Sequence, residues 1–176
     1  NSNEKVAEKG HKTEEAINTI DEKLTRYLIT LSSEALSQKE SEVLTNILDS
    51  SRDLERIGDH AEALININDY LQRKNVQFSN SALEELEDIY RQTSEFVKDA
   101  LESVENNDLE MAESLIERHE AINKMERVLR KTHIKRLNNG ECSTQAGVNF
   151  IDIISHYTRV SDHAMNLAEK VLAEQI

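Results

Sequence analysis

The sequence predicts an all-α fold. Its 176 residues include no Pro and only four Gly, so few positions force a turn or end a helix. Aliphatic residues recur every three or four positions over long stretches, as they do along the buried face of a helix. Two segments, 54–61 and 157–164, share an Arg, an aliphatic residue and Asp-His-Ala at matching positions. The chain is therefore expected to contain two related helical units.

Five long helices are predicted from the aliphatic spacing and from the breaks between them. They span residues 4–33, 37–73, 81–104, 109–137 and 144–174. Ser37 with Glu40, and Ser81 with Glu84, are capping-box patterns that predict the starts of the second and third helices. A Ser-rich segment ends the first helix, and Asn-Asn-Gly at 138–140 favours a left-handed turn after the fourth.

A second sequence match shows how the five helices divide between the units. Glu-Ala-Ile-Asn occurs at 15–18 and again at 120–123, each time upstream of an Asp-His-Ala segment. The third helix then belongs to unit two and has no counterpart in unit one. We predict duplicated antiparallel three-helix bundles in a single domain, with unit one at 1–76 missing its leading helix and unit two at 77–176 complete.

An incomplete first bundle leaves an apolar helix face without a partner. Unit one can close its core on unit two, on a second copy of the chain or on a segment upstream of Asn1. A homodimer is therefore one expected arrangement. The chain begins with Asn and not with Met, which predicts that a longer protein continues upstream.

The net charge of −13 argues against nucleic acid as a partner, because a phosphate backbone would be repelled by most of this surface. No apolar run approaches the roughly 20 residues that cross a bilayer. The single cysteine, Cys142, cannot form an internal disulfide, so a reducing compartment is expected. Its surroundings show no partner that would activate the thiol, and we assign it no role.

Three carboxylates line one side of the second predicted helix. Glu55, Asp59 and Glu62 follow an i, i+4, i+7 spacing at the edge of the apolar stripe. They are either a solvated acidic edge or, if they face the interior, ligands for a hard cation such as Mg, Ca, Mn or Fe. Spacing alone favours the solvated edge. In unit two only the middle carboxylate of the three, Asp162, is retained.

The histidines and the motif search give little support for catalysis. His60 and His163 each follow an Asp and can be proton shuttles, metal ligands or structural residues at the bundle edge. The structural role is favoured because no nucleophile and no closed set of histidines accompanies them. One Glu-x-x-His pair, Glu8 with His11, falls short of the two pairs that a di-iron bundle needs. We predict that the protein is not an enzyme.

The segment 54–61, Leu-Glu-Arg-Ile-Gly-Asp-His-Ala, with its repeat and the upstream Ile-Asn helices, resembles a PhoU domain. The resemblance implies paired three-helix bundles that regulate phosphate uptake, some of which bind metal clusters through Glu/Asp-x-x-x-Asp motifs. Carried onto this chain, it implicates Glu55, Asp59 and Asp162 as metal ligands, with divalent or iron cations as the cofactor. Glu14 and Asn166 are weaker candidates for the same role.

Two branches of this family are possible. Segments 27–32 and 36–41 resemble the cytoplasmic tail of bacterial sodium/phosphate cotransporters, and the Pro-x-x-x-Asp-Leu-Arg stretch of free-standing PhoU regulators is missing. The first expectation is therefore a non-catalytic regulatory domain at the cytoplasmic face of the membrane, whose partner is the membrane domain of the same sodium-dependent phosphate transporter. The alternative is a free-standing PhoU-type regulator of phosphate ABC transport and phosphate signalling, bound to a phosphate transport complex.

Overall fold

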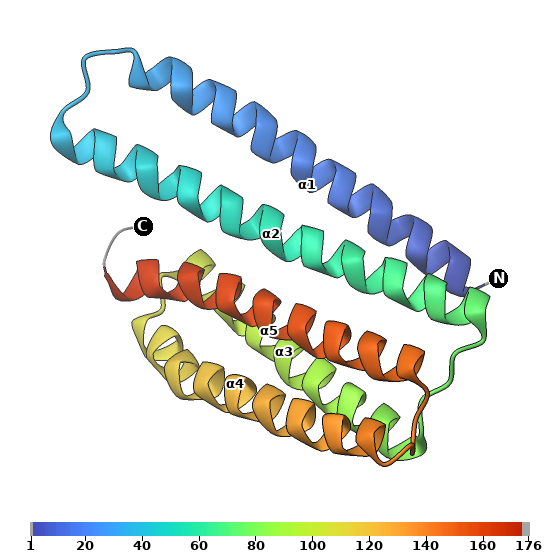
Figure 1. Ribbon diagram of the computed structural model, residues 1–176. Coiled ribbons are helices and arrows are strands. Elements are labelled where there is room, and N and C mark those ends of the chain that lie inside the picture. The colour runs from blue at the N-terminus through green and yellow to red at the C-terminus, as the bar shows by residue number, and fades with distance from the viewer. Residues whose placement is uncertain (1, 174–176) are drawn as a thin grey trace.

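The computed structural model describes residues 2–173 and contains five α-helices and no strand within that range. The helices are α1 (Ser2–Ser32), α2 (Gln38–Lys74), α3 (Asn80–Asn106), α4 (Leu109–Asn138) and α5 (Thr144–Leu172). Figure 1 shows α1 and α2 as an antiparallel pair above a group formed by α3, α4 and α5. The all-α prediction is confirmed. The predicted end of the fifth helix, Glu174, lies outside the described residues.

Helix α5 connects the two parts of the molecule. It packs against α3 and α4 on one side and against α2 on the other, whereas α1 packs only against α2 among the described helices. The chain therefore forms a complete three-helix bundle and an additional helical pair, as the sequence repeat predicted. The division into units at residue 76 within one domain stays a prediction.

Most of the buried apolar side chains belong to the three-helix bundle. Both clusters of fully packed residues come entirely from α3, α4 and α5 and include Phe96, Leu115, Ile122, Phe150 and Ile154. Each such side chain contributes roughly 1.5–3 kcal/mol of transfer free energy when buried. Helix α2 contributes Ile57 to the edge of one cluster. The bundle is thus the stable framework on which the α1–α2 pair is mounted.

The α1–α2 pair keeps part of its apolar surface in contact with solvent. By the repeat, Ile47 corresponds to Phe150, yet Ile47 is 41% exposed and Phe150 is fully buried. The reason is that α3 covers the bundle at Phe150 and no described helix covers α2 at Ile47. Near the α1–α2 loop, the uncovered face forms a groove of about 370 Å³ lined mainly by Leu28, Leu31, Leu36, Val43, Leu44 and Ile47.

Polar caps set the helix ends. The predicted capping box at α2 is present: Ser37 Oγ accepts the Glu40 N–H at 3.3 Å, and the Glu40 carboxylate accepts the Ser37 N–H at 2.8 Å. The predicted cap of α3 at Ser81 is wrong. Ser79 is the N-cap, because its extended backbone directs its hydroxyl to the Ala82 N–H, and the helix starts at Asn80.

A small residue allows α1 and α2 to approach closely. Gly58 is buried where the helices pack, and a Cβ at that position would lie 3.3 Å from Ile17 Cδ1. The equivalent residue of the second repeat is Ser161, which is also fully buried. The small residue in the Arg-Ile-Gly-Asp sequence is therefore explained by helix packing.

Candidate functional site

Helix packing places several carboxylates along the contact between α1 and α2, which we call the α1–α2 seam. Glu14 and Asp21 come from α1, and Glu55 and Asp59 come from α2. Burial raises the pKa of Glu55, and the charge of Asp59 raises it further, followed by weaker contributions from Asp21 and Glu14. The Glu55 side chain is 24% exposed. The seam therefore concentrates negative charge where solvent only partly screens it.

Each of these carboxylates has a protein partner. Arg56 donates to Asp59 at 3.0 Å and lies 3.6 Å from the Glu55 carboxylate, which lowers the pKa of Glu55 in part. The Asn18 amide donates to Glu14. Asp21 accepts a hydrogen bond from Ser51 at 2.6 Å. A cation bound at this seam would have to compete with the Arg56 guanidinium for Glu55 and Asp59.

The equivalent positions in the second repeat form a different cluster, at the α4–α5 seam. His119 Nε2 lies 2.9 Å from Asp162 Oδ1, and Arg159 donates to the other oxygen of Asp162 at 3.3 Å. His119 occupies the position of Glu14, and Thr158 occupies the position of Glu55. Asp162 is the one carboxylate left at the positions of Glu14, Glu55 and Asp59, and imidazole and guanidinium groups already bind it.

The five predicted metal ligands do not form one site. Glu14, Glu55 and Asp59 gather at the α1–α2 seam, while Asp162 belongs to the α4–α5 seam. Asn166 lies at the contact between α2 and α5, where its amide donates to Asp53 at 2.8 Å. Within the described residues, no group of three or more His, Cys, Asp and Glu is arranged to hold a metal ion. Metal binding at Glu55 and Asp59 stays a prediction.

A third polar cluster joins the two parts of the molecule at the α2–α5 seam. Asp53 of α2 accepts hydrogen bonds from His163 Nδ1 at 2.9 Å and from Asn166 at 2.8 Å, and its side chain is 13% exposed. The Nδ1 atoms of His60 and His156 lie 3.0 Å apart, and the rings of His60 and His163 stack at 5.8 Å. These contacts align α2 and α5, which run in opposite directions in Figure 1.

The internal repeat explains why the seam contains paired contacts. Asp53 and His156 occupy equivalent positions, and so do His60 and His163. Because α2 and α5 are antiparallel, residue 53 faces residue 163, and the equivalent pair joins residue 156 to residue 60. The two contacts of the α2–α5 seam therefore lie at positions that the repeat relates, although one contains Asp53 where the other contains His156.

Burial keeps two of these histidines neutral. It lowers the pKa of His60, and the neighbouring His156 and His163 lower that pKa further, against the opposing effect of Asp59. Burial also lowers the pKa of His156, with Asp152 opposing. Between two neutral rings one Nδ1 can donate and the other accept, which accounts for their close approach. Sequence reasoning treated His60 and His163 as edge residues and missed Asp53, whose only sequence signal was its alignment with His156.

Cys142, a potential nucleophile, lies near His133, a potential base. Its sulfur lies 3.8 Å from His133 Nε2. The His133 ring is buried and stacked on Phe150 with centroids 4.0 Å apart, and its Nδ1 has no hydrogen-bond partner among the described residues. Burial also lowers the pKa of His133. A catalytic base is held by an orienting acceptor, and this pair has none.

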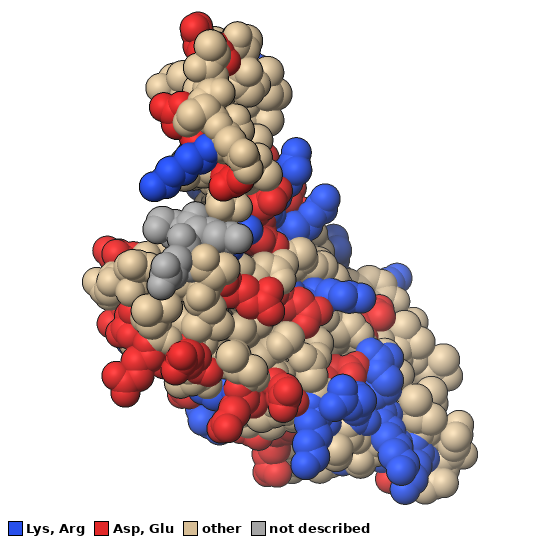
Figure 2. Space-filling model, turned by 90° about the vertical axis from the view of Figure 1, so that its left-hand side faces the viewer, with Lys and Arg blue, Asp and Glu red and all other residues tan. Residues whose placement is uncertain are grey.

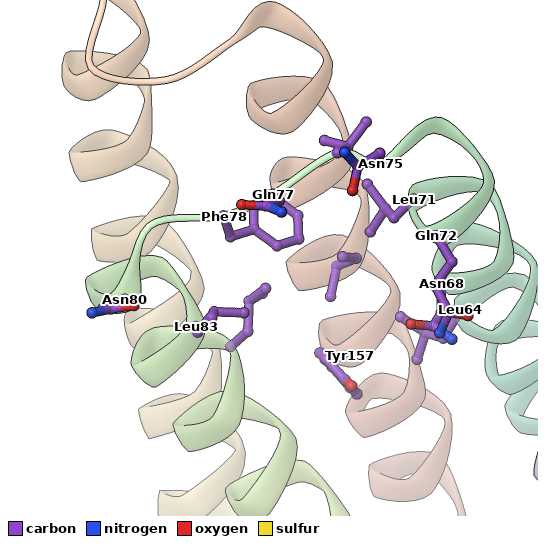
Figure 3. A pocket seen from close by; sticks show the side chains of 13 residues that line it. Leu64, Asn68, Leu71, Gln72, Asn75, Gln77, Phe78, Asn80, Leu83 and Tyr157 are labelled. Carbon is purple, nitrogen blue, oxygen red and sulfur yellow. The ribbon is translucent and has the colours of Figure 1, made fainter. Parts of the chain in front are cut away.

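A hollow of about 640 Å³ lies beside the α2–α3 connection. Figure 3 shows side chains of α2, α3, α5 and the connection converging on it, including Leu71, Phe78, Leu83 and Tyr157. None of its lining residues is charged, and its polar groups are mainly carboxamides. Burial raises the pKa of Tyr157, so its hydroxyl stays protonated. The sequence did not predict this hollow.

The described helices include none that is both long and apolar enough to cross a membrane. The comparisons with known proteins bear on family and fold. A family model described as "PhoU domain" matches residues 1–67 and 86–171. A curated relative from Thermotoga maritima, "Phosphate-specific transport system accessory protein PhoU homolog 1", is 31% identical over 134 residues. The match covers 76% of this chain and 57% of the relative, so the chain spans little more than half of that protein.

Two solved structures have the same fold. The crystal structure of PhoU from Pseudomonas aeruginosa aligns with a TM-score of 0.84 and 21% identity, covering 97% of this chain and 82% of that one. The phosphate transport system regulatory protein PhoU from Streptococcus pneumoniae aligns with a TM-score of 0.74 and 22% identity, covering 97% and 77% respectively.

These relatives correct the predicted branch. The expectation of a regulatory tail on a sodium-dependent phosphate cotransporter, with a membrane domain of the same protein as partner, is wrong, because the relative and both structures are PhoU proteins. The alternative, a PhoU-type regulator, is the better supported one. The family model spans most of the chain and the curated relative exceeds 30% identity. The chain therefore belongs to the PhoU domain family.

Proposed function

We propose that the protein is a PhoU-type regulator of phosphate transport that acts by binding other proteins and not by catalysis. The observation that carries this proposal is the 31% identity to an accessory protein of a phosphate-specific transport system. The matched 134 residues are more than either unit contains, so the similarity includes parts of both. The described residues also lack an assembled nucleophile, base and orienting group.

The partner that we propose is a protein of a phosphate transport complex, at the cytoplasmic face of the membrane. Its docking surface would be the uncovered α1–α2 face, where Ile20, Tyr27, Val43 and Ile47 are all more than 40% exposed. An apolar face between two helices suits an amphipathic helix, which would lie where α3 lies in the complete bundle. This docking accounts for apolar side chains that no described helix covers.

We also propose that the α1–α2 seam binds a hard cation through Glu55 and Asp59, with Glu14 nearby. Two features support this: burial and then the neighbouring carboxylates raise the pKa of Glu55, and carboxylate oxygens are the ligands that Mg²⁺, Mn²⁺ and iron accept. Asp162 and Asn166 are bound by other side chains and are not part of this proposed site.

The docking proposal can be tested by affinity purification from the native host under phosphate limitation and phosphate excess. Subunits of a phosphate transporter should copurify with the wild-type protein and be lost with Ile20→Ser/Tyr27→Ser. The matched control is Leu83→Ser/Leu101→Ser, two exposed side chains of α3, which should retain the partner. Absence of transporter subunits from the wild-type sample, or equal recovery with all three proteins, would contradict the proposal.

A further inference from the structure

The hollow beside the α2–α3 connection is lined by uncharged side chains, although the helices around it are rich in charge. None of its 13 lining residues is charged, whereas 31% of the whole chain is. On the last turns of α2, the charged Asp69, Arg73 and Lys74 alternate with lining residues and are not part of the lining. On α3, Leu83 and Leu86 line the hollow and the glutamates next to them do not. The neutral lining therefore belongs to the helix faces that meet at the hollow and does not follow from the local composition. Figure 2 shows how densely charged side chains cover another face of the molecule.

Five carboxamide side chains supply the polar groups of this lining. All five are on exposed residues, and none forms a side-chain hydrogen bond with another described residue: Asn68, Gln72, Asn75, Gln77 and Asn80. Figure 3 shows Asn68 and Gln77 on different sides of the hollow. Each carboxamide offers two N–H donors and one acceptor oxygen. The hollow is thus surrounded by donors and acceptors that carry no charge.

Two aromatic rings complete the lining, and neighbouring rings hold both of them. Phe78 packs edge-on against the buried Phe150, with ring centroids 6.1 Å apart, and Tyr157 lies beside Tyr90 at 6.0 Å. The Tyr157 hydroxyl stays protonated because burial raises its pKa, and it forms no hydrogen bond with another described residue. The hydroxyl of a largely buried tyrosine usually has a partner, so this O–H is available to a ligand.

Two simpler explanations do not account for this lining. A gap filled only by water does not require charged residues to be absent from the faces around it. A space for another helix would be lined by apolar side chains, as the α1–α2 groove is at Leu28, Val43 and Ile47. A covering helix would also remove the carboxamides from water without replacing their hydrogen bonds, which is unfavourable. Uncharged polar groups beside aromatic rings suit a small molecule better than either.

We propose that this hollow binds a purine nucleoside, a flat and uncharged molecule with donors and acceptors along its edges. The volume of about 640 Å³ lies within the range of small-molecule sites, which combine apolar walls with a few polar groups. Asn and Gln side chains bind the edge of adenine through paired hydrogen bonds, and aromatic side chains stack on bases. A phosphate group would meet no cation in the lining and a chain of net charge −13, so the nucleoside fits better than the nucleotide.

A ligand in this hollow would bridge the two parts of the molecule. Asn68 belongs to α2 of the α1–α2 pair, whereas Tyr157 belongs to α5 of the three-helix bundle. Binding would therefore add to the free energy that holds α2 against α5. The inference does not rest on the proposed transport partner, because that partner would dock on the α1–α2 face and no residue of α1 lines the hollow.

Substitutions that preserve the helices test this site. Asn68→Ala/Gln72→Ala removes two exposed carboxamides one turn apart on α2, where alanine favours the helix. Tyr157→Phe removes only the hydroxyl and keeps the ring. The matched control, Asn66→Ala/Gln145→Ala, also removes one Asn and one Gln from exposed helix positions, but neither residue lines the hollow.

The measurement is isothermal titration calorimetry with adenosine, inosine and adenosine monophosphate, and circular dichroism establishes that every variant is helical. A nucleoside of about 19 non-hydrogen atoms is expected to bind with a dissociation constant on the order of 0.1 mM. We expect binding of the better nucleoside to weaken at least about tenfold in Asn68→Ala/Gln72→Ala, about threefold or more in Tyr157→Phe, and less than about twofold in the control.

Three results would each overturn the inference. The first is that neither nucleoside binds the wild type at concentrations up to about 5 mM. The second is that the monophosphate binds as tightly as the nucleoside. The third is that Asn68→Ala/Gln72→Ala binds as well as the matched control. All three are measured on the purified chain, so loss of phosphate regulation in the host would count against the proposed function and leave this site unaffected.

Discussion

The Nδ1 atoms of His60 in α2 and His156 in α5 lie 3.0 Å apart. Among the described helices, the packing of α2 against α5 is the one helix–helix contact between the α1–α2 pair and the three-helix bundle. At that distance the rings can share one hydrogen bond when both are neutral, but two imidazolium groups would repel. The attachment of the α1–α2 pair therefore depends on the protonation of these residues.

Acidification is expected to weaken the protein at this contact. Burial lowers the folded-state pKa of both His60 and His156 below the ordinary value of about 6.5, so the unfolded chain binds more protons once the pH falls below that value. Their contribution to the free energy of unfolding is complete above about pH 6.5 and decreases as the pH falls towards the folded-state pKa. Asp59, Asp152, His163 and Arg159 also face these rings and modulate the effect.

Urea unfolding between about pH 7 and pH 5 would measure this dependence. The variant His60→Gln/His156→Gln should lose less stability on acidification than the wild type, because glutamine does not titrate. The carboxylates common to both proteins cancel in the comparison. Parallel pH profiles for the two proteins would rule out a role for these histidines in pH dependence.

Asp53 should contribute more to stability than other acidic residues on α2. Asp53→Ala removes the acceptor of both His163 and the exposed Asn166, and leaving the partly buried His163 donor unpaired costs about 1–3 kcal/mol. The control is Asp49→Ala on the same helix, whose one ion pair, with Arg52, is exposed and 3.8 Å long. The control should change the free energy of unfolding by less than about 0.5 kcal/mol. Equal effects of the two substitutions would refute the importance of this contact.

Close packing of Gly58 against Ile17 limits the size of the side chain that position 58 can hold. Gly58→Leu forces a branched side chain against Ile17 and should lower the free energy of unfolding by about 1–3 kcal/mol. Ala61→Leu, at an exposed position of α2 three residues away, is the matched control and should be close to neutral. Combining Gly58→Leu with Ile17→Ala should recover part of the loss. If Ile17→Ala did not restore stability to Gly58→Leu, the clash would not be with Ile17.

Substitutions at Glu55 test whether the α1–α2 seam binds a cation or is only a group of crowded carboxylates. Because burial and neighbouring carboxylates raise its pKa, the charged form is disfavoured in the folded state, and Glu55→Gln should raise the melting temperature of the metal-free protein near neutral pH. If the seam binds a cation, added Mg²⁺ or Mn²⁺ should raise the melting temperature of the wild type but not that of Glu55→Gln/Asp59→Asn. Identical responses of both proteins to the metals would reject the cation site.

The sequence predicted the helices well because the signals for helices are local. Aliphatic spacing and the Ser37–Glu40 capping box depend on residues within a few turns of one another. The cap of α3 was misplaced by two residues because Ser79 and Ser81 both precede the helix, and only the backbone conformation shows which hydroxyl reaches an N–H. The duplication also predicted the unequal number of helices in the two parts.

The candidate sites were harder to predict because they depend on which helices meet. The motif implicated Glu55 and Asp59 in unit one and Asp162 in unit two, but it did not predict that Asp162 pairs with His119. The contact of Asp53 with His163 joins residues 110 positions apart and follows only once α2 and α5 are known to be antiparallel neighbours. The branch of the family was misjudged because short segments outside the repeated motif carried too much weight.

Phosphate uptake in the native host tests the central claim most directly. The coding sequence would be replaced by the wild type, by an inactive truncation, or by the Ile20→Ser/Tyr27→Ser variant, and uptake of labelled phosphate measured in phosphate-limited and phosphate-replete cells. The account predicts that uptake responds to phosphate supply with the wild type, loses that response with the truncation, and loses it equally with the variant. An unchanged response in cells that carry the truncation would contradict the assignment of this PhoU domain protein to the regulation of phosphate transport.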